Sequence, residues 1–356
     1  MTKHTKENGR LRLRKIVESF PKLTITVLAD LVADEFVFGE ISRVSREAPV
    51  LILKHRNRTV VPGGGANAIY NLADLGVNVL PVGVVGDDEP GKQLLRAFRH
   101  KRIPVSGVFK DKSYTTVTKT RILAGFAHTA GQQVVRLDRE PSEGPKSHLR
   151  RELVLAAREY ARASDALLVS DYGYGAATPT LLNVIREKRG IDKVPVTLDS
   201  RHRLLEFSGV TAATPNESEV EEALGIRIGK DNDNNNNNDN DWERLLAAGE
   251  QIAGAMNLES LVITRGKDGM VVFPRRHKPV DIPIHGSDEV TDVTGAGDTV
   301  IATFTAALAA GASAEEAAHL ANYAGGIVVM KRGTATVSQQ ELLDALEKTP
   351  PVAREH

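Results

Sequence analysis

The feature that most constrains the fold is a repeated alternation of short apolar runs with longer segments of helical pattern. The runs with the length and composition of buried strands are residues 23–30, 78–86, 165–173, 194–200, 209–216 and 260–266. Helical patterns occupy residues 65–76, 89–101, 147–163, 178–189, 217–225, 242–257, 297–310, 314–331 and 339–347. Strands that alternate with helices predict an α/β fold around a mostly parallel sheet. Ligands of such sheets bind beyond the carboxyl ends of the strands, so polar residues at those ends are the first site candidates.

Two regions interrupt this alternation and predict a second, smaller sheet. Residues 35–61 and 114–139 alternate apolar with polar side chains, as antiparallel strands with one solvated face do. We expect them to form a β-sheet lid on the main domain, which we place at residues 15–348. The remaining apolar residues of the lid predict a contact between two copies of the chain, and hence a homodimer.

Composition excludes several classes of protein. Among 356 residues, 46 Lys and Arg balance 46 Asp and Glu, so the charge gives no support to nucleic-acid or membrane binding. The chain has no cysteine, which rules out disulfides and thiolate metal sites. A signal peptide and a membrane-spanning apolar run are both lacking, so we expect a cytoplasmic protein. The Asn/Asp-rich residues 230–241 predict a disordered insertion.

The stretch "VTDVTGAGDTVIATFTAAL", residues 290–308, places glycines where an apolar helix begins. Gly295 and Gly297 allow backbone conformations closed to other residues and a close approach to a ligand. The unpaired N–H groups and the positive dipole end of a helix N-terminus bind anions. Asp298 in such a place is either a helix cap or a base that acts beside a bound anion.

Two other glycine-rich stretches imitate nucleotide-binding motifs. Residues 86–93, "GDDEPGKQ", end in Gln93, whereas a P-loop needs a hydroxyl to hold magnesium there. Residues 63–68, "GGGANA", fit a dinucleotide fingerprint, but the preceding segment is polar and ends in proline instead of forming a buried strand. We therefore interpret neither as a nucleotide site, although the second keeps a nicotinamide-dependent dehydrogenase open as an alternative.

Three motifs in order resemble the ribokinase-like (PfkB) family of carbohydrate kinases. They are "PGGGANAIYNLADLG" (62–76), "TPNESE" (214–219) and "DVTGAGD" (292–298), and the likeness extends over roughly residues 15–348. Within the family the chain most resembles the kinase domain of the bacterial heptose-phosphate kinases of ADP-heptose synthesis, through residues 41–50, 116–124, 132–140 and 168–175. We expect no second, nucleotidyltransferase domain after residue 348. Tyr174 departs from that likeness, because a lysine is expected there.

The resemblance implies an ATP-dependent kinase and a role for each matching residue. Asp298 would accept the proton of a sugar hydroxyl, while the N–H groups of Gly295, Ala296 and Gly297 stabilise the transferring phosphoryl group. The residues implied to bind the sugar or its phosphate are Asp34, Gly63, Gly64, Asn67, Lys119, Arg121 and Arg136. Asn216 and Glu219 are implied to act near Mg²⁺, and Asp292 near a monovalent cation such as K⁺. The residues implied to bind ATP are Asn216, Thr264, Arg265, Gly266 and Asn322.

Each implied role has a structural alternative, and the substrate stays open. Asn216 also fits a helix N-cap, Asp298 a first-turn carboxylate, and the lid cations a solvated strand face. Our preferred acceptor is heptose 7-phosphate, phosphorylated at its anomeric hydroxyl. A kinase for another sugar, such as ribose or fructose phosphate, and a non-catalytic sugar-binding or regulatory module on the same fold remain alternatives.

Overall fold

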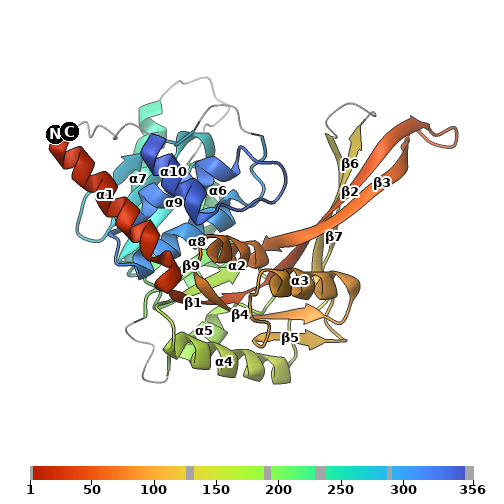
Figure 1. Ribbon diagram of the computed structural model, residues 1–356, viewed down its shortest axis with the longest axis horizontal. Coiled ribbons are helices and arrows are strands. Elements are labelled where there is room, and N and C mark those ends of the chain that lie inside the picture. Colours follow the sequence, from red (N-terminus) through yellow and green to blue (C-terminus); the bar gives the residue numbers. More distant parts are fainter. Residues whose placement is uncertain (1–2, 126–131, 188–193, 229–237, 287–290, 349–356) are drawn as a thin grey trace.

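The computed structural model describes residues 3–125, 132–187, 194–228, 238–286 and 291–348 (Figure 1). Its larger sheet has nine strands in the order β13-β12-β11-β10-β9-β8-β1-β4-β5. These strands are β1 (Thr24–Ala29), β4 (Asn78–Gly86), β5 (Val108–Asp111), β8 (Ala166–Asp171), β9 (Val196–Ser200), β10 (Ala212–Ala213), β11 (Ser260–Thr264), β12 (Met270–Pro274) and β13 (Val280–Ile282). Neighbours pair in parallel from β11 to β5, whereas β12 and β13 pair antiparallel at one edge. The predicted α/β class and all six predicted strands are confirmed.

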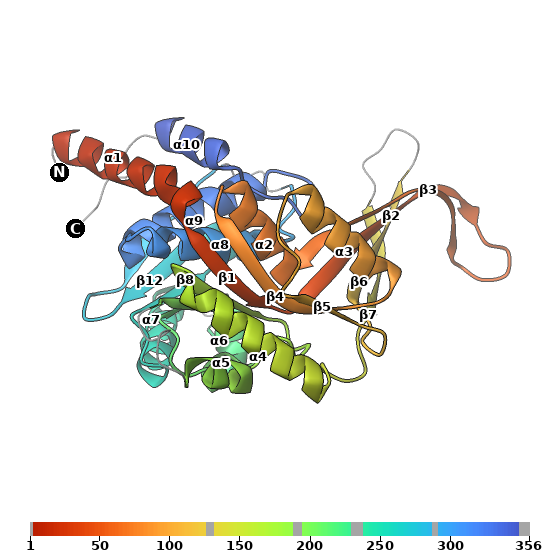
Figure 2. The same cartoon turned by 60° about the horizontal axis from the view of Figure 1, so that its bottom comes forward.

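Helices cover both faces of this sheet, because its strands are apolar on both sides. In β1, Ile25 and Val27 belong to one buried cluster and Leu28 belongs to the other. The first cluster also takes side chains from α1 (Lys3–Ser19), α2 (Gly65–Asp74), α3 (Glu89–His100), α8 (Ala296–Ala309), α9 (Ala314–Val328) and α10 (Gln339–Lys348). The second takes them from α4 (Ser147–Arg162), α5 (Pro179–Arg186), α6 (Glu217–Leu224) and α7 (Asn238–Ala255), and Figure 2 shows α4 and α5 on that face. The fold is thus a three-layer α/β/α domain.

The predicted small sheet is present and extends away from the main domain (Figure 1). Its strands are β2 (Leu31–Val44), β3 (Leu51–Gly64), β6 (Val117–Gly125) and β7 (Gln132–Arg139), in the order β3-β2-β6-β7. The pairs β2–β3 and β6–β7 are antiparallel, as predicted. The central pair β2–β6 is parallel, which the alternation of polar and apolar residues does not reveal. Since β2 begins directly after Asp30, the residue that follows β1, the chain passes from the larger sheet straight into the small sheet.

Some elements differ from the prediction. Helix α1 begins at Lys3, before the predicted domain start at residue 15, and packs beside α10. Of the predicted insertion 230–241, residues 238–241 form the start of α7, and the rest lies outside the described residues. Within the part of the chain that the structure describes, no helix is long and apolar enough to cross a membrane.

Candidate functional site

The N-terminus of α8 lies against α2 through a close backbone approach. Gly295, the N-cap, has a φ of 81°, and a Cβ added there would lie 2.5 Å from Nδ2 of Asn67. Gly297 differs, because a Cβ added to it would meet no atom of the described residues within 4 Å. One glycine therefore permits packing against α2, and the other leaves open space above the first turn of the helix.

Asp298 is buried in that first turn and is held from two sides. Its Oδ2 accepts a hydrogen bond of 3.0 Å from Nδ2 of Asn67, and its Oδ1 accepts one of 2.7 Å from the hydroxyl of Tyr172. Burial and the negative charge of Asp199 raise the pKa of Asp298 to about 8, against the opposing effect of these two hydrogen bonds. A carboxyl group with a pKa near the working pH is suited to accept a proton.

The backbone donors at this turn differ from the expected set. The N–H of Ala296 donates to the carbonyl of Val293 at 3.2 Å, so that N–H is engaged in a turn. The N–H groups of Gly297 and Asp298 precede the first i to i−4 hydrogen bond, which runs from Thr299 to the carbonyl of Gly295. The anion-binding capacity of the turn therefore rests on the residues just after Ala296.

The charge of Asp199 acts on Asp298, and Asp199 has a second acidic neighbour in Glu219. Asp199 belongs to β9, and Glu219 lies in the first turn of α6. Burial, followed by the charges of Glu219 and Asp171, raises the pKa of Asp199 to about 8. Burial raises the pKa of Glu219 to about 7, although its bond from the Asn216 N–H opposes the shift. Arg201 lowers the pKa of both carboxylates but does not offset the rise, so the pair favours a further cation nearby.

Asn216 and Glu219 form a capping box at the start of α6. The side chain of Asn216 accepts from the N–H of Glu219, and the Glu219 carboxylate accepts from the N–H of Asn216, each at 2.9 Å. The N-cap alternative is thus present, and the remaining lone pairs of Glu219 are left for water or metal. Among the described residues, no group of three or more His, Cys, Asp or Glu is arranged to hold a metal ion.

The lid places a row of charged side chains on one face, above the start of α2. Across β2 and β6, Asp34 lies opposite Lys119, and Phe36 lies opposite Arg121. Arg121 donates to Asp34 at 2.6 Å, and the hydroxyl of Thr334 donates to the other oxygen of Asp34 at 2.8 Å. A Cβ on Gly63 would lie 2.4 Å from the Asp34 carboxylate, so glycine is required there.

The other lid cations differ in exposure. Lys119 lies with its Nζ 5.5 Å from the centre of the Tyr172 ring, and burial, followed by the nearby charge of Arg201, lowers its pKa. Arg136 is half exposed and pairs with Asp138 of its own strand at 2.9 Å. The structure therefore brings Asp34, Lys119 and Arg121 to the site, whereas Arg136 is engaged at the edge of the lid.

The residues expected near ATP are spread over several elements. Thr264, at the end of β11, forms a β-bridge with Asn216, which places it beside the acidic pair. Arg265 turns toward the helices, 5.3 Å from the centre of the Trp242 ring, and Gly266 follows it with a φ of 54°. Asn322, on α9, donates to the carbonyl of Pro283 at 2.6 Å.

Asp292 fixes two backbone segments that flank the α8 turn. Its carboxylate accepts from the N–H of Thr294 at 2.9 Å and from the N–H of Gly333 at 3.0 Å. Burial alone would raise the pKa of Asp292, but these hydrogen bonds outweigh it and lower the pKa. An ionised carboxylate in this position can either organise the turn or bind a cation behind it.

Two residues of the candidate site, Tyr172 and Thr334, were not singled out from the sequence. Tyr172 directly follows β8, so the rule that ligands bind at carboxyl strand ends could have selected it. Thr334 reaches Asp34 from 300 positions along the chain, and no sequence signal indicates it. The excluded P-loop stretch begins α3, and there the carboxylate of Asp88 accepts from the N–H of Gly91, where a phosphate would need to lie.

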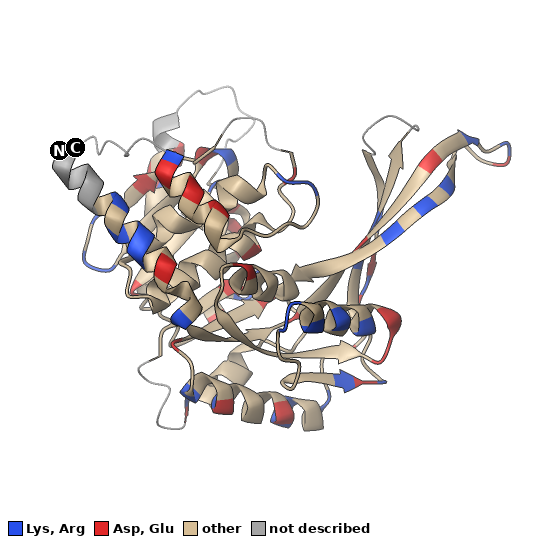
Figure 3. Cartoon of the chain, in the orientation of Figure 1, with Lys and Arg blue, Asp and Glu red and all other residues tan. Residues whose placement is uncertain are grey.

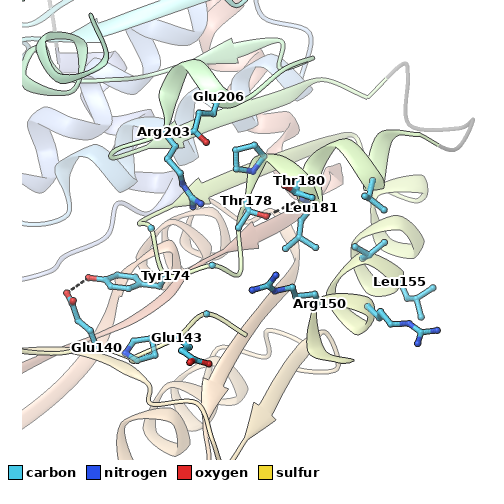
Figure 4. A pocket seen from close by; sticks show the side chains of 18 of the residues that line it. Glu140, Glu143, Arg150, Leu155, Tyr174, Thr178, Thr180, Leu181, Arg203 and Glu206 are labelled. Atoms are coloured by element: carbon cyan, nitrogen blue, oxygen red, sulfur yellow. Dashed lines mark hydrogen bonds between the residues drawn. The ribbon is translucent and has the colours of Figure 1, made fainter. Parts of the chain in front are cut away.

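A separate cavity of about 920 Å³ lies between α4, α5 and the loop after β8 (Figure 4). Tyr174 lines it and donates to Glu140 at 2.8 Å. Its charged lining residues include both signs, and Arg203 is already paired with Asp171. Asp298 does not line it, so this cavity is distinct from the candidate site.

Comparisons with known proteins find a family model, related chains and solved structures that are similar to this chain. The model of the pfkB family of carbohydrate kinases matches residues 32–341. The bifunctional protein HldE of Geobacter metallireducens is 40% identical over 338 residues, which cover 94% of this chain and 66% of that relative. The chain thus spans slightly less than two thirds of the length of this relative.

Two solved structures share the fold at low sequence identity. Arabidopsis thaliana ribokinase, complexed with ribose and ATP, has a TM-score of 0.68 at 20% identity, covering 92% of this chain and 99% of its own. Phosphofructokinase-2 from Escherichia coli, in complex with potassium, has a TM-score of 0.71 at 16% identity, covering 91% and 98% respectively. The ribokinase-like fold of this chain is thereby shown.

Proposed function

Because the chain belongs to the pfkB family of carbohydrate kinases, we propose that it transfers the γ-phosphoryl group of ATP to the anomeric hydroxyl of heptose 7-phosphate. The observation that carries this proposal is the first turn of α8, where a buried Asp298 borders the open space above Gly297. The choice of acceptor is supported by the resemblance to heptose-phosphate kinases noted in the sequence, by the likeness to the bifunctional protein HldE and by the cations of the lid. ATP and a divalent metal follow from the family.

In this proposal the protein positions the reactants and stabilises the negative charge of the transferring phosphoryl group, as phosphoryl transfer requires. Asp298 accepts the proton of the acceptor hydroxyl as that oxygen bonds to the γ-phosphorus. The N–H groups of Gly297 and Asp298 face the negative charge of the phosphoryl group at the helix N-terminus. Ala296 and Gly295 shape the turn, and Asn67 holds the base from α2.

Mg²⁺ would lie near Glu219 and Asp199 and bind them through its waters, with Asn216 and Thr264 beside it. Their raised pKa values support this placement, because the charge of Arg201 compensates the two carboxylates only in part. Mg²⁺ bound there would neutralise charge on the phosphates of ATP. Gly266, Arg265 and Asn322 are proposed to border the nucleotide, and Asp292 to hold K⁺ behind the α8 turn.

The phosphate of the acceptor is proposed to bind at the lid. Arg121 and Lys119 are held over the entrance to the site, and Arg suits bidentate capture of phosphate. Asp34, Gly63, Gly64 and Arg136 would complete the sugar side, with Asp34 exchanging one of its present partners for a sugar hydroxyl.

An ADP-release assay with a panel of acceptors tests the proposal. The panel contains heptose 7-phosphate, fructose 6-phosphate, ribose and a nucleoside, each with ATP and Mg²⁺. We expect heptose 7-phosphate to give the highest kcat/KM by at least tenfold. Activity with an unphosphorylated sugar alone would contradict the phosphate-binding role of Lys119 and Arg121.

We also propose that two copies pair through the lid. The lid exposes large apolar side chains, namely Phe38, Val44, Val50, Leu51, Val134, Val135 and Leu137. Lys and Arg residues also lie along β3, as Figure 3 shows. We propose that pairing of two lids covers these apolar side chains, because large exposed apolar surfaces are typical of interfaces. Light scattering should give the mass of a dimer for the native chain and of a monomer for Leu137→Asp, whereas Leu155→Asp on α4 should leave the dimer intact.

A further inference from the structure

We infer that Tyr172 is a positioning residue: its hydroxyl orients the Asp298 carboxylate and favours the ionised form that accepts the substrate proton. The inference rests on the proposed role of Asp298. The Tyr172 hydroxyl lies 2.7 Å from Oδ1 of Asp298, and Asn67 occupies Oδ2 from the opposite side. With one donor on each oxygen, the plane of the carboxylate is fixed, and its other lone pairs stay available to an acceptor hydroxyl.

Tyr172 is itself held by the backbone that follows β8. Its N–H donates to Oδ2 of Asp30 at 3.0 Å, and Asp30 also accepts the N–H groups of Tyr174 and Ala176. Asp30 is 1% exposed, so this carboxylate anchors the loop from within the sheet. Gly173 permits the turn with a φ of 86°. The loop therefore sets the position of the Tyr172 ring, and it does so independently of Asp298.

The ring has close neighbours that limit its movement. A Cβ on Gly64 would lie 3.2 Å from Cε2 of Tyr172, so the start of α2 packs directly on the ring. The Nζ of Lys119 lies 5.5 Å from the ring centre, on the lid side. Tyr172 thus joins β8, α2, the lid and α8 at one point, where a sugar held between the lid and α8 would contact the ring.

The charges around Asp298 make this hydrogen bond significant. The ionisable groups that influence Asp298 or Tyr172 come from several elements: Asp34 on β2, Lys119 on β6, Asp199 on β9 and Glu219 on α6. Burial, Asp199 and Asp34 disfavour the carboxylate form of Asp298, while Glu219 acts on Tyr172. The bonds from Tyr172 and Asn67 act in the opposite direction. Removing the Tyr172 hydroxyl should therefore raise the pKa of Asp298.

Tyr172 donates its hydrogen throughout the reaction and does not serve as the base. Burial and the charge of Asp298 raise the pKa of Tyr172 well above its usual value, so the phenol stays protonated. The proton of the acceptor hydroxyl passes to Asp298 while the acceptor oxygen bonds to the γ-phosphorus. The bond from that phosphorus to the bridging oxygen breaks, and ADP leaves with both bonding electrons. No additional reactant is needed.

The test compares pH profiles of kcat/KM for the acceptor in native enzyme and in Tyr172→Phe. The profile of kcat/KM reports the pKa values of the free enzyme, which is the state described here. We expect the acidic limb to move to higher pH by about one unit, a tenfold change in proton affinity. Activity should fall about tenfold below the limb and recover toward the native value above it, with the KM for ATP changed less than twofold.

Two further proteins make the result decisive. Tyr160→Phe loses a tyrosine hydroxyl that bonds to Ser106, away from the site, and should keep the native profile. Fluorotyrosine at position 172 keeps the ring and has a more acidic hydroxyl, so it should move the limb to lower pH. It also serves as the test if Tyr172→Phe does not fold. An unmoved limb in the folded variants, or loss of activity equal at every pH, would overturn the positioning role.

The same measurements separate this inference from the proposed function. If Asp298→Asn abolishes turnover while the Tyr172 variants keep the native profile, Asp298 is the base and Tyr172 does not tune it. If Asp298→Asn retains native turnover, the proposed role of Asp298 fails, and the role of Tyr172 fails with it.

Discussion

Gly297→Ala should make the protein slightly more stable and much less active. Gly297 lies in the first turn of α8, and a Cβ added there meets no atom of the described residues within 4 Å. Alanine in a helix is favoured over glycine by up to about 1 kcal/mol. The folded protein therefore accepts the methyl group without a steric cost, and any loss of activity must come from the ligand.

The loss of activity follows from the space that the methyl group fills. Phosphate bound at a helix N-terminus approaches the backbone closely, and the proposed phosphoryl position lies above Gly297. We expect kcat/KM for ATP to fall at least tenfold, which corresponds to about 1.4 kcal/mol of transition-state binding. Isothermal titration with an ATP analogue should show weaker binding by a comparable factor.

Gly254→Ala is the matched control for this experiment. Gly254 lies in α7, and a Cβ added there also meets no described atom within 4 Å. Both variants should show a denaturation midpoint equal to or above that of the native protein, and Gly254→Ala should keep native kinetics. A Gly297→Ala protein with native kcat/KM would refute the placement of the phosphoryl group above the α8 turn.

Three further outcomes follow from the charges of the site. Folding raises the pKa of Asp298 to about 8, so the native protein loses stability as pH rises from about 4 to 8. Asp298→Asn does not ionise and escapes this loss. Its melting temperature relative to that of the native protein should therefore increase from pH 5 to pH 8.5 in differential scanning fluorimetry. Glu219→Gln should raise the Mg²⁺ concentration for half-maximal activity several-fold in steady-state assays, with metal-free ATP binding unchanged. Arg121→Gln should raise the KM for a phosphorylated acceptor at least tenfold and leave the KM for ATP unchanged.

Much of the fold could be predicted because its strands are apolar on both faces and its helices are periodic. Strands β1, β8 and β11 are short, mostly apolar and almost entirely buried, which is typical of central parallel strands. The edge strand β5 and the short β13 lack that signal, and their pairing depends on neighbours already in place. The parallel pairing of β2 with β6 likewise depends on how the chain crosses between the sheets.

The site was predictable where it is local in sequence and unpredictable where it depends on tertiary contact. Gly295 and Asp298 share one turn, and their residue types alone predict an anion site with an acidic side chain beside it. The engagement of the Ala296 N–H and the hydroxyl of Tyr172 on Asp298 depend on backbone geometry and on a contact across 126 positions. A local contact can also be missed: the pairing of Arg136 with Asp138 on the same strand was not predicted.

The most direct test of the central claim is single-turnover phosphoryl transfer by Asp298→Asn with saturating ATP, Mg²⁺ and heptose 7-phosphate. General-base catalysis typically contributes about 10²–10⁴-fold, so the rate of ADP formation should fall by that factor. Dissociation constants for ATP and the acceptor should stay within about threefold of the native values. Native-like turnover in this variant would contradict the claim that the Asp298 carboxylate accepts the substrate proton.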